Sequence, residues 1–473
     1  MSFGISNITF INRLRRQMSS FKPGTTTAAD ERAPLLNGGS SRSHTHVSRG
    51  HVEHHNHRSP VITFLIDSEH TPGLNSENLT IHCLAKTWHV TKVTLFSNYV
   101  NLLLPCVPIG IVAGALGWNP TAVFTLNFFA IMPLAAVLSF ATEEISLKLG
   151  ETMGGLLNAT FGNAVELIVS IVALKDGQIG IVQSSMLGSI LSNLLLVMGM
   201  CFFFGGLVHR GESGNGFEQK FSSAVAQASC SLMTLSSASL IIPAALYGVL
   251  AQVSDGKDGK MDKDASILQL SRGTAIILLI LYVLYLVFQL RTHSNLFDPE
   301  EQPADDAEPE EPSLGPVAAG AVLVATTVLV AICAEYLVGS IDSLVETAGI
   351  SKAFIGLILI PIVGNAAEHV TAVVVAVRNK MDLAMGVAIG SSIQIALLVT
   401  PFLVIVGWII NQPMSLHFET FETVAFAVSV LVVTYTVQDG RSNYLEGAML
   451  LGLYIIIAVA FYVVPGSALD PDA

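Results

Sequence analysis

Two glutamates stand inside the same short motif, each within a long apolar stretch. Gly162–Glu166 reads Gly-Asn-Ala-Val-Glu, and Gly364–Glu368 reads Gly-Asn-Ala-Ala-Glu 202 residues further along the chain. No Lys or Arg lies near either glutamate within these stretches. A carboxylate at the middle of a bilayer costs at least about 2.5 kcal/mol, so it persists only if it is protonated, paired or bound to a cation. Two such carboxylates in one site would match a divalent cation, and two protons once the cation has left.

The polar residues around the glutamates suit a hard cation, which prefers oxygen ligands. Asn163 and Asn365 each precede their glutamate by three residues and therefore share a helix face with it. Gly162 and Gly364 would allow a helix break that exposes backbone carbonyls. The alternative for such small and amide residues is close helix packing. Further candidate ligands lie at or beside helical spacing in the next segment of each copy: Ser189, Ser192 and Asn193, and Ser391, Ser392 and Gln394.

Four more titratable residues could relay protons or steady the site. Glu143 and Glu144 end one apolar stretch, and Glu335 lies in another. His369 follows Glu368 directly, and an unperturbed histidine titrates near pH 6.5. Consecutive helix residues point about 100° apart, however, so a packing or hydrogen-bonding role for His369 is equally consistent with the sequence.

The composition indicates where these residues lie. Of the 473 residues, 51% are hydrophobic and only 12% charged, whereas about a quarter of a soluble domain is charged. Residues 93–142 and 177–208 are among several runs without any Asp, Glu, Lys or Arg. Runs of this length are typical of membrane helices. The sequence therefore predicts an all-α polytopic membrane protein.

Other classes of protein find no support in the sequence. The net charge is −13, and no basic stripe interleaved with aromatic residues favours nucleic-acid binding. The five cysteines are scattered without a CxxC pair, so neither a disulfide scaffold nor a zinc site is indicated. No HExxH motif, phosphate loop or nucleophile elbow points to an enzyme. We expect no cofactor.

Eleven transmembrane helices are predicted, separated by Pro, Gly and polar residues. The spans lie near residues 96–116, 121–141, 153–174, 183–207, 222–250, 273–291, 316–339, 352–377, 383–410, 420–437 and 444–464. They divide the chain into a polar, disordered cytosolic tail, an extra first helix, a five-helix repeat, an acidic cytosolic linker, a second five-helix repeat and a short C-terminal tail. The predicted boundaries are 1–92, 93–120, 121–292, 293–315, 316–465 and 466–473.

The two halves are copies of each other. The motif match continues at the same offset, since Gly188-Ser189 corresponds to Gly390-Ser391. A unit of five spans ends on the opposite side of the membrane from its start, so the second copy must enter with inverted topology. Inverted repeats are the arrangement of many secondary transporters, whose sites lie at the midplane between the repeats.

The terminal tail and the linker carry the remaining signals. The balance of Lys and Arg between loops is nearly even, and the basic N-terminal tail favours a cytosolic N-terminus. That orientation places the linker, with eight acidic residues between 298 and 311, in the cytosol. Glu31–Leu36 resembles an acidic dileucine sorting signal for vacuolar or endosomal membranes. Six histidines between His44 and His57 could bind a metal weakly, although a solvated tail is the simpler interpretation.

These motifs resemble those of the cation/proton exchanger branch of the calcium/cation antiporter superfamily, and most of all its fungal vacuolar calcium/proton exchangers. The likeness rests on the paired Gly-Asn-Ala-x-Glu motifs, the Gly-Ser stretches from Gly188 and Gly390, and the acidic insert between the halves. Sodium/calcium exchangers carry Ser-Ala-Pro-Glu at the glutamate, and this departure favours protons as the counter-ion. The resemblance implies calcium binding at Glu166 and Glu368, with Asn163, Asn365, Ser189, Ser391 and Gln394 lining the site.

The sequence thus predicts a transporter that exchanges cytosolic calcium for lumenal protons across the membrane of an acidic organelle, the vacuole. Calcium, protons and the lipid bilayer are the expected partners, and no nucleic acid is expected. Exchange of manganese or a monovalent cation for protons on the same fold is an alternative, and a passive cation channel is another. The oligomeric state, the affinity and the stoichiometry stay open.

Overall fold

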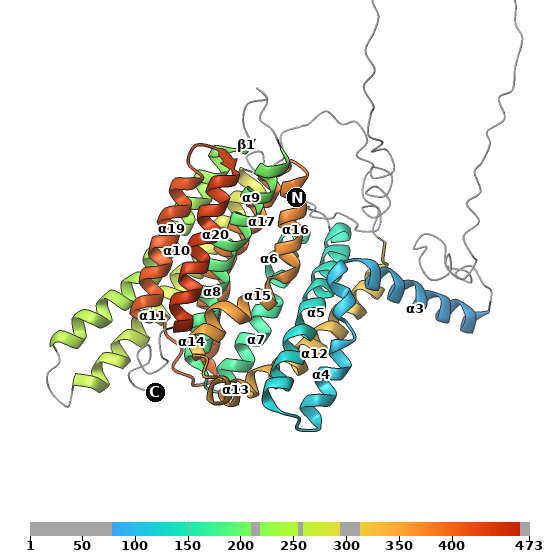
Figure 1. Cartoon of the computed structure of the whole chain (residues 1–473), viewed down its shortest axis with the longest axis horizontal. Coiled ribbons are helices and arrows are strands. Elements are labelled where there is room, and N and C mark those ends of the chain that lie inside the picture. Colours follow the sequence, from blue (N-terminus) through green and yellow to red (C-terminus); the bar gives the residue numbers. More distant parts are fainter. Residues whose placement is uncertain (1–77, 150, 210–217, 254–258, 294–312, 464–473) are drawn as a thin grey trace, which may run out of the picture. The chain divides into compact units, whose positions relative to one another are not determined.

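The computed structural model describes residues 78–149, 151–209, 218–253, 259–293 and 313–463 (Figure 1). The tail histidines, the dileucine motif, most of the acidic linker and the C-terminal tail lie outside these residues. The described chain falls into two compact units, one ending at Phe96 and the other containing everything from Ser97 onward.

The first unit contributes one helix, α3 (Leu79–Phe96). The predicted tail extended to residue 92, so its last part is helical rather than disordered. The physical reason lies in the sequence, since residues 79–96 contain neither Pro nor Gly and therefore nothing that breaks a helix.

The second unit begins with the extra helix and the first half of the repeat. The predicted first span is broken by Pro105 into a 3-10 helix and a helix of only 10 residues. The elements are η1 (Tyr99–Leu103), α4 (Cys106–Ala115), α5 (Pro120–Leu149), α6 (Glu151–Phe161), α7 (Ala164–Lys175), α8 (Ile179–Leu191), the π-helical η2 (Ser192–Val197), α9 (Met198–Val208), α10 (Ser223–Val253), α11 (Gly259–Val287) and the π-helical η3 (Phe288–Thr292).

The second half repeats this order. Its elements are α12 (Pro316–Gly339), α13 (Ile341–Ala348), α14 (Lys352–Phe354), the π-helical η5 (Ile355–Leu359), α15 (Ile360–Gly364), α16 (Ala366–Val377), α17 (Met381–Gln394), the π-helical η6 (Ile395–Val399), α18 (Thr400–Ile409), α19 (Thr420–Thr436) and α20 (Tyr444–Val463). One short antiparallel sheet joins the halves, formed by β1 (Glu218–Lys220) and β2 (Arg441–Asn443).

The all-α polytopic membrane architecture is confirmed, apart from that short sheet. Among the described residues, seven helices are long and apolar enough to cross a membrane, and the bent pair Lys352–Gly364 and Ala366–Val377 makes an eighth. The other three predicted spans correspond to α4, to α19 with 17 residues, and to α6 with α7, which are separated by a break. The number eleven therefore stays a prediction.

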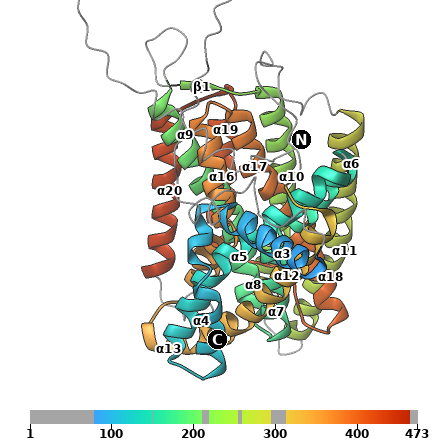
Figure 2. The ribbon, with the colours of Figure 1, turned by 90° about the vertical axis from the view of Figure 1, so that its right-hand side faces the viewer.

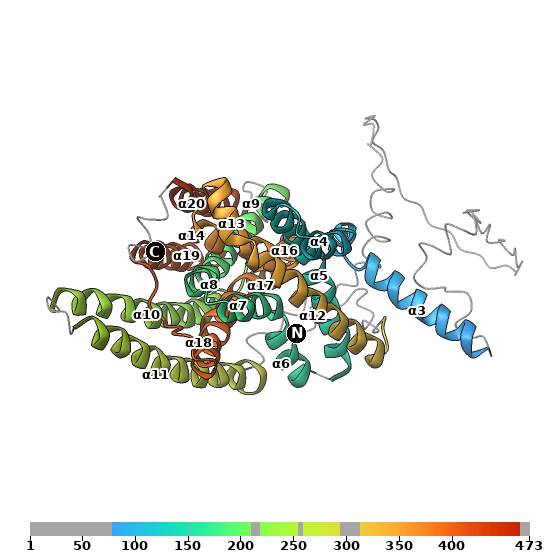
Figure 3. The same ribbon diagram turned by 90° about the horizontal axis from the view of Figure 1, so that it is seen from below.

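The two halves are related by inversion. Glu144 near the end of α5 accepts a hydrogen bond from the backbone N–H of Leu314, just before α12 begins, so these corresponding helices run antiparallel. Equivalent helices also have equivalent neighbours in the other half. The contact of α9 with α20 has its counterpart in the contact of α18 with α11, and the contact of α5 with α16 has its counterpart in the contact of α12 with α7. Figure 3 shows α7, α8, α16 and α17 lying between α4 and α5 on one side and α10 and α11 on the other.

The sheet and α13 lie at opposite ends of this unit, as Figures 1 and 2 show. At the β1–β2 end, Gln219 donates to the carbonyl oxygen of Ala376 at 2.9 Å, and His209 Nε2 lies 2.6 Å from that of Val377. At the α13 end, Lys352 forms an ion pair with Asp342 at 2.8 Å. The helices between these two ends form the membrane-spanning body.

Candidate functional site

The repeated motif breaks a helix in both halves. Asn163 and Asn365 lie between helices with backbone angles outside the α-helical region, φ −101° and ψ 21° for the first and φ −95° and ψ 6° for the second. In the second half the two helix segments are bent by 60°. Glu166 and Glu368 consequently lie in the first turns of α7 and α16. The positive end of a helix dipole stabilises a carboxylate there.

The breaks bring the two halves together at the glutamates. Glu166 is 5% exposed, and its Oε1 lies 2.7 Å from where a Cβ on Gly364 would stand. The Glu166 carboxyl group therefore occupies the space that a side chain at the other motif's glycine would fill. Glu368 lies near both Glu166 and Ser391, so the charges of the two glutamates repel each other.

Polar residues from both halves form one hydrogen-bonded network beside the glutamates. Asn163 Nδ2 donates to Gln394 Oε1 at 2.6 Å, and Ser391 Oγ donates to Asn163 Oδ1 at 3.4 Å. Asn193 Nδ2 donates to Ser391 Oγ at 3.1 Å. The structure thus brings together four residues that were selected from spacing alone. The Asn and Gln side chains link neighbouring helices, as expected if these residues serve helix packing, and the links lie beside the glutamates.

The remaining predicted ligands have different surroundings. Ser192 Oγ and His369 Nε2 lie 3.2 Å apart, so His369 joins the first half to the second. Ser392 donates back to the carbonyl of Ala388 in its own helix at 2.9 Å. Ser189 is buried at 1% exposure. Gly162 directly follows α6, and its N–H donates to the carbonyl of Asn158 at 2.8 Å.

The three other candidate carboxylates are spread along α5 and α12. Glu144 is buried and holds the backbone N–H of Leu314 at 2.7 Å. Glu143 is half-buried on the same helix, and Glu335 is exposed on α12. The three therefore lie on other elements than the Asn, Ser and Gln side chains of the network.

Oxygen atoms at the centre of the site are left for a cation. Within the described residues, Oε2 of Glu166, Oε2 of Glu368 and both side-chain polar atoms of Asn365 are buried without a hydrogen-bond partner. A buried polar atom without a partner costs about 1–3 kcal/mol, more when charged, and a bound cation would remove that cost at the oxygens. No group of three or more His, Cys, Asp or Glu side chains suited to a metal is found in the described part of the chain. The site therefore offers two carboxylates with neutral oxygen donors around them.

Widened helical turns follow the site in both halves. η2 begins at Ser192 and η6 begins directly after Gln394, which are equivalent places in the two repeats. Such π-helical turns are frequent at functional sites because they displace backbone carbonyls from the regular ladder. Nothing in the sequence pattern indicated them.

One buried carboxylate was not predicted from the sequence. Glu422 lies in the first turn of α19, is 2% exposed and accepts a hydrogen bond from Ser184 Oγ at 2.5 Å. It occurs in no repeated motif. The only available signal was that a charged residue stood within the predicted span 420–437.

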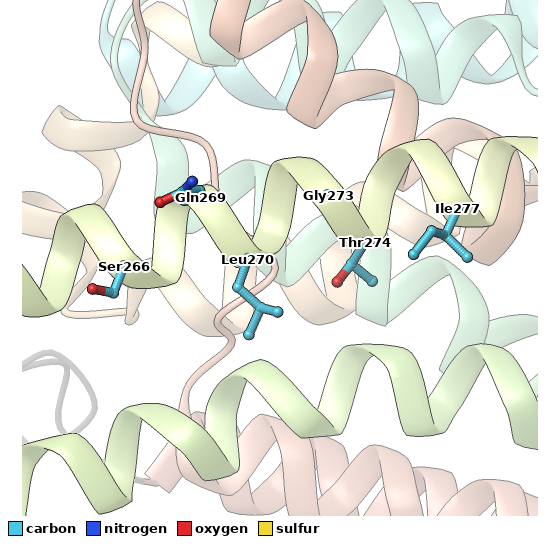
Figure 4. Close-up of a pocket in the computed structure, with 6 residues that line it drawn as sticks. All are labelled: Ser266, Gln269, Leu270, Gly273, Thr274 and Ile277. Atoms are coloured by element: carbon cyan, nitrogen blue, oxygen red, sulfur yellow. The ribbon is translucent and has the colours of Figure 1, made fainter.

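A pocket of about 450 Å³ lies away from these residues. Its lining consists of Ser266, Gln269, Leu270, Gly273, Thr274 and Ile277, all on α11 (Figure 4). None of them is charged, so this pocket does not offer the carboxylates that a cation requires.

The sequence is similar to a family model and to several known transport proteins. The family model of the sodium/calcium exchanger protein matches residues 119–291 and 318–463. A vacuolar calcium ion transporter of Schizosaccharomyces pombe is 52% identical over 376 residues, covering 80% of this chain and 87% of the relative. A Ca²⁺/H⁺ antiporter of Aphanothece halophytica is 44% identical over 386 residues, covering 80% and 98%.

The solved structures agree with this assignment. The crystal structure of the Ca²⁺/H⁺ antiporter protein YfkE is 37% identical, with a TM-score of 0.62 over 77% of this chain and 98% of the other. An H⁺/Ca²⁺ exchanger named CAX is only 12% identical but has a TM-score of 0.56, which shows the same fold. The resemblance to cation/proton exchangers that the motifs indicated is confirmed, and the chain belongs to the sodium/calcium exchanger protein family.

Proposed function

We propose that this protein exchanges cytosolic calcium for protons of an acidic organelle, the vacuole, and that Glu166 and Glu368 carry both ions in turn. One observation supports this above all. Two carboxylates, the buried Glu166 and the half-buried Glu368, come one from each inverted half to paired helix breaks and retain buried oxygen atoms without hydrogen-bond partners. The names of the relatives, a vacuolar calcium ion transporter and Ca²⁺/H⁺ antiporters, agree with this choice of ions.

The chemistry follows from charge balance in a site of low dielectric constant. Two carboxylates that repel each other bind a divalent cation or two protons, since either neutralises the pair. Calcium also requires about six to eight oxygen ligands, which neutral donors such as Asn365 can help to supply. Calcium and protons then compete for the same oxygens. Movement of calcium to one side and of the protons that replace it to the other, in alternation, gives obligatory exchange.

The packing indicates which side the site faces. At the α13 end, α8 packs directly against η5, α14 and α15. At the β1–β2 end, a Cβ on Gly390 would have no described atom within 4 Å. The predicted cytosolic N-terminus would place the β1–β2 end in the cytosol, and the side of the site closed by α8 and η5 would then be the lumenal one.

The test is calcium uptake into sealed vesicles that hold the full chain and have an acidic interior. We expect uptake to collapse when a protonophore dissipates the gradient. Glu166→Gln and Glu368→Gln should each abolish uptake, because one remaining carboxylate cannot neutralise a divalent ion. Glu346→Gln, which changes an exposed carboxylate on α13, is the control and should leave uptake unchanged.

Three outcomes would count against the proposal. Uptake that ignores the proton gradient would indicate a passive channel. Normal exchange in Glu166→Gln or Glu368→Gln would exclude the two-carboxylate site. Manganese or a monovalent cation that outcompetes calcium at equal concentration would change the assigned substrate.

A further inference from the structure

Glu422 is a buried carboxylate in the membrane-spanning body that the exchange site does not include. It is 2% exposed in the first turn of α19, a helix that carries no other charged residue. Its hydrogen-bond donor is the Ser184 hydroxyl on α8, at 2.5 Å between the oxygens. No described Lys or Arg forms an ion pair with it. An acid kept at such a position at the cost of its desolvation is a functional residue by default.

Its partner Ser184 lies in the contact that closes the site. The Cβ of Ser184 lies 2.8 Å from where a Cβ on Gly356 would stand, so Ser184 packs directly against η5. Opening the contact between α8 and η5 would therefore uncover Ser184 and the carboxyl group that it holds. Glu422 would then become accessible from the compartment on the α13 side at the same time as the exchange site.

The same helix connects Glu422 to the exchange site. Ser184, Gly188 and Ser192 follow one another at four-residue spacing, and Ser185, Ser189 and Asn193 do the same on the adjacent face. At 1.5 Å per residue, Ser192 lies about 12 Å along the helix axis from Ser184. Ser192 in turn contacts His369, the neighbour of Glu368. Small and polar residues on α8 and η2 thus form a line from Glu422 toward the glutamates.

The pair has no counterpart in the other half. At the repeat offset of 202 residues, Ser184 corresponds to Gly386, and α10, the counterpart of α19, contains no Asp or Glu. The exchange site is built symmetrically from both repeats, whereas this acid exists only on the side that α8 and η5 close. A device on one side only is useful where the two compartments differ, as they do in proton concentration.

We propose that Glu422 is a proton-binding residue that takes protons from the compartment on the α13 side and passes them toward Glu166 and Glu368. This inference rests on the function proposed above. In the open state the carboxylate of Glu422 binds one proton from that compartment and becomes a neutral acid. It then gives the proton, by way of the α8 hydroxyls and intervening water, to a carboxylate that calcium has left. Glu422 returns to its ionised form, and one proton has moved from the compartment on the α13 side to the exchange site.

Few other titratable groups compete with Glu422 in this part of the molecule. α8 and η2, which pack against α19, carry none within the described residues. α10 contributes Cys230 and Tyr247, and α20 contributes Glu446 and three tyrosines: Tyr444, Tyr454 and Tyr462. Immediately before α19 lie His417, which stacks on Tyr247, and Glu419, the charge nearest to Glu422.

The experiment measures calcium uptake by the full chain in sealed vesicles while interior pH is varied at constant exterior pH. Glu422→Gln keeps the shape and can still accept from Ser184, but it cannot bind a proton. We expect its uptake to lose the dependence on interior pH that the unaltered chain shows, whereas Glu422→Asp retains it. Calcium binding at equilibrium should be unchanged in Glu422→Gln and lost in Glu166→Gln. Glu346→Gln is the matched control.

The outcomes separate this inference from the proposed function. A wild-type pH profile in Glu422→Gln would overturn it and make the Ser184 contact a purely structural one. If Glu422→Gln fails to reach the membrane, Ser184→Ala decides, because it keeps the acid and removes its donor: an unchanged profile would overturn the inference and a shifted one would support it. Uptake without proton coupling in the unaltered chain would refute the proposed function, and this inference with it.

Discussion

The two ends of the membrane-spanning body are made from equivalent sequences and packed differently. At the α13 end, a Cβ on Gly188 would lie 2.7 Å from the Cα of Leu357 and closer still to its carbonyl group. The equivalent residues at the β1–β2 end are Gly390 and Gly155. Gly390 has open space around it, and Gly155 instead faces Leu290 at 3.0 Å. Repetition of sequence therefore has not produced repetition of contacts.

This difference is what an exchanger with inverted repeats requires. If both ends closed at once the ions could not enter, and if both opened at once the gradient would leak. Two equivalent sets of residues that adopt different packings give two states of similar energy, between which a ligand can shift the population. The glycines permit close backbone approach at whichever end is closed.

The largest effect is expected from a methyl group at the closed end. Gly188→Ala places a Cβ against the backbone of Leu357, and overpacking of this kind costs about 1–3 kcal/mol. That cost would favour opening of the α13 end by about 5- to 150-fold. Gly390→Ala meets no described atom in this state, so it should not open the α13 end.

Thiol labelling can measure this opening. Ser185→Cys places a buried thiol on α8 beside Gly356, in a chain whose Cys83 and Cys106 are replaced by serine. We expect Gly188→Ala to speed labelling, and Gly390→Ala to leave it unchanged or slow it. Equal acceleration by both substitutions would refute the asymmetry between the ends.

A smaller effect on stability is expected where the halves join near the β1–β2 end. Glu144→Ala leaves the buried backbone N–H of Leu314 without its acceptor, which costs about 1–3 kcal/mol. Thermal unfolding of the purified chain should show this loss. Glu335→Ala, at an exposed position on α12, should cost no more than about 0.5 kcal/mol. Because Glu144 here acts on α12 rather than on the ions, the proton dependence of exchange should not change. A changed proton dependence would restore the relay role suggested by the sequence.

The two glutamates of the candidate site could be predicted because the same motif occurs in both halves of the sequence. One copy of Gly-Asn-Ala-x-Glu is a weak signal, but two copies in apolar segments identify Glu166 and Glu368 through the cost of a buried charge. Inversion then requires the copies to meet, and the bond between Asn163 and Gln394 bears this out. The expected network needed only helical periodicity and symmetry.

What was missed depends on tertiary packing that no local pattern encodes. Glu422 is buried only because α8 lies across the first turn of α19, and a single acid at the start of a span is typical of the membrane surface. Glu144 was assigned a possible relay role, yet its carboxylate accepts a hydrogen bond from the backbone N–H of Leu314, which is distant in the sequence. The different packing at Gly188 and Gly390 could not be inferred at all, since the two positions are equivalent in sequence.

The smallest expected effect concerns the exposed contacts at the two ends. At the α13 end, Asp342 pairs with Lys352 at 2.8 Å and accepts from Gln178 at 2.9 Å, so it joins the segment before α8 to the start of α14. At the β1–β2 end, Arg441 and Glu218 lie 3.5 Å apart within the sheet. Exposed pairs contribute only about 0.2–1 kcal/mol. Asp342→Asn should therefore speed labelling of the Ser185→Cys thiol at most about fivefold.

Glu218→Gln is the control for this small effect. Both substitutions remove one exposed ion pair, but only Asp342 lies across the contact that α8 makes with the elements from α14 onward. Added salt should mimic Asp342→Asn in the unaltered chain, because salt screens exposed charges. A labelling rate that responds to neither salt nor Asp342→Asn would assign the closure to the backbone packing at Gly188 alone. A response to Glu218→Gln as large as that to Asp342→Asn would instead mean that the two ends do not act separately.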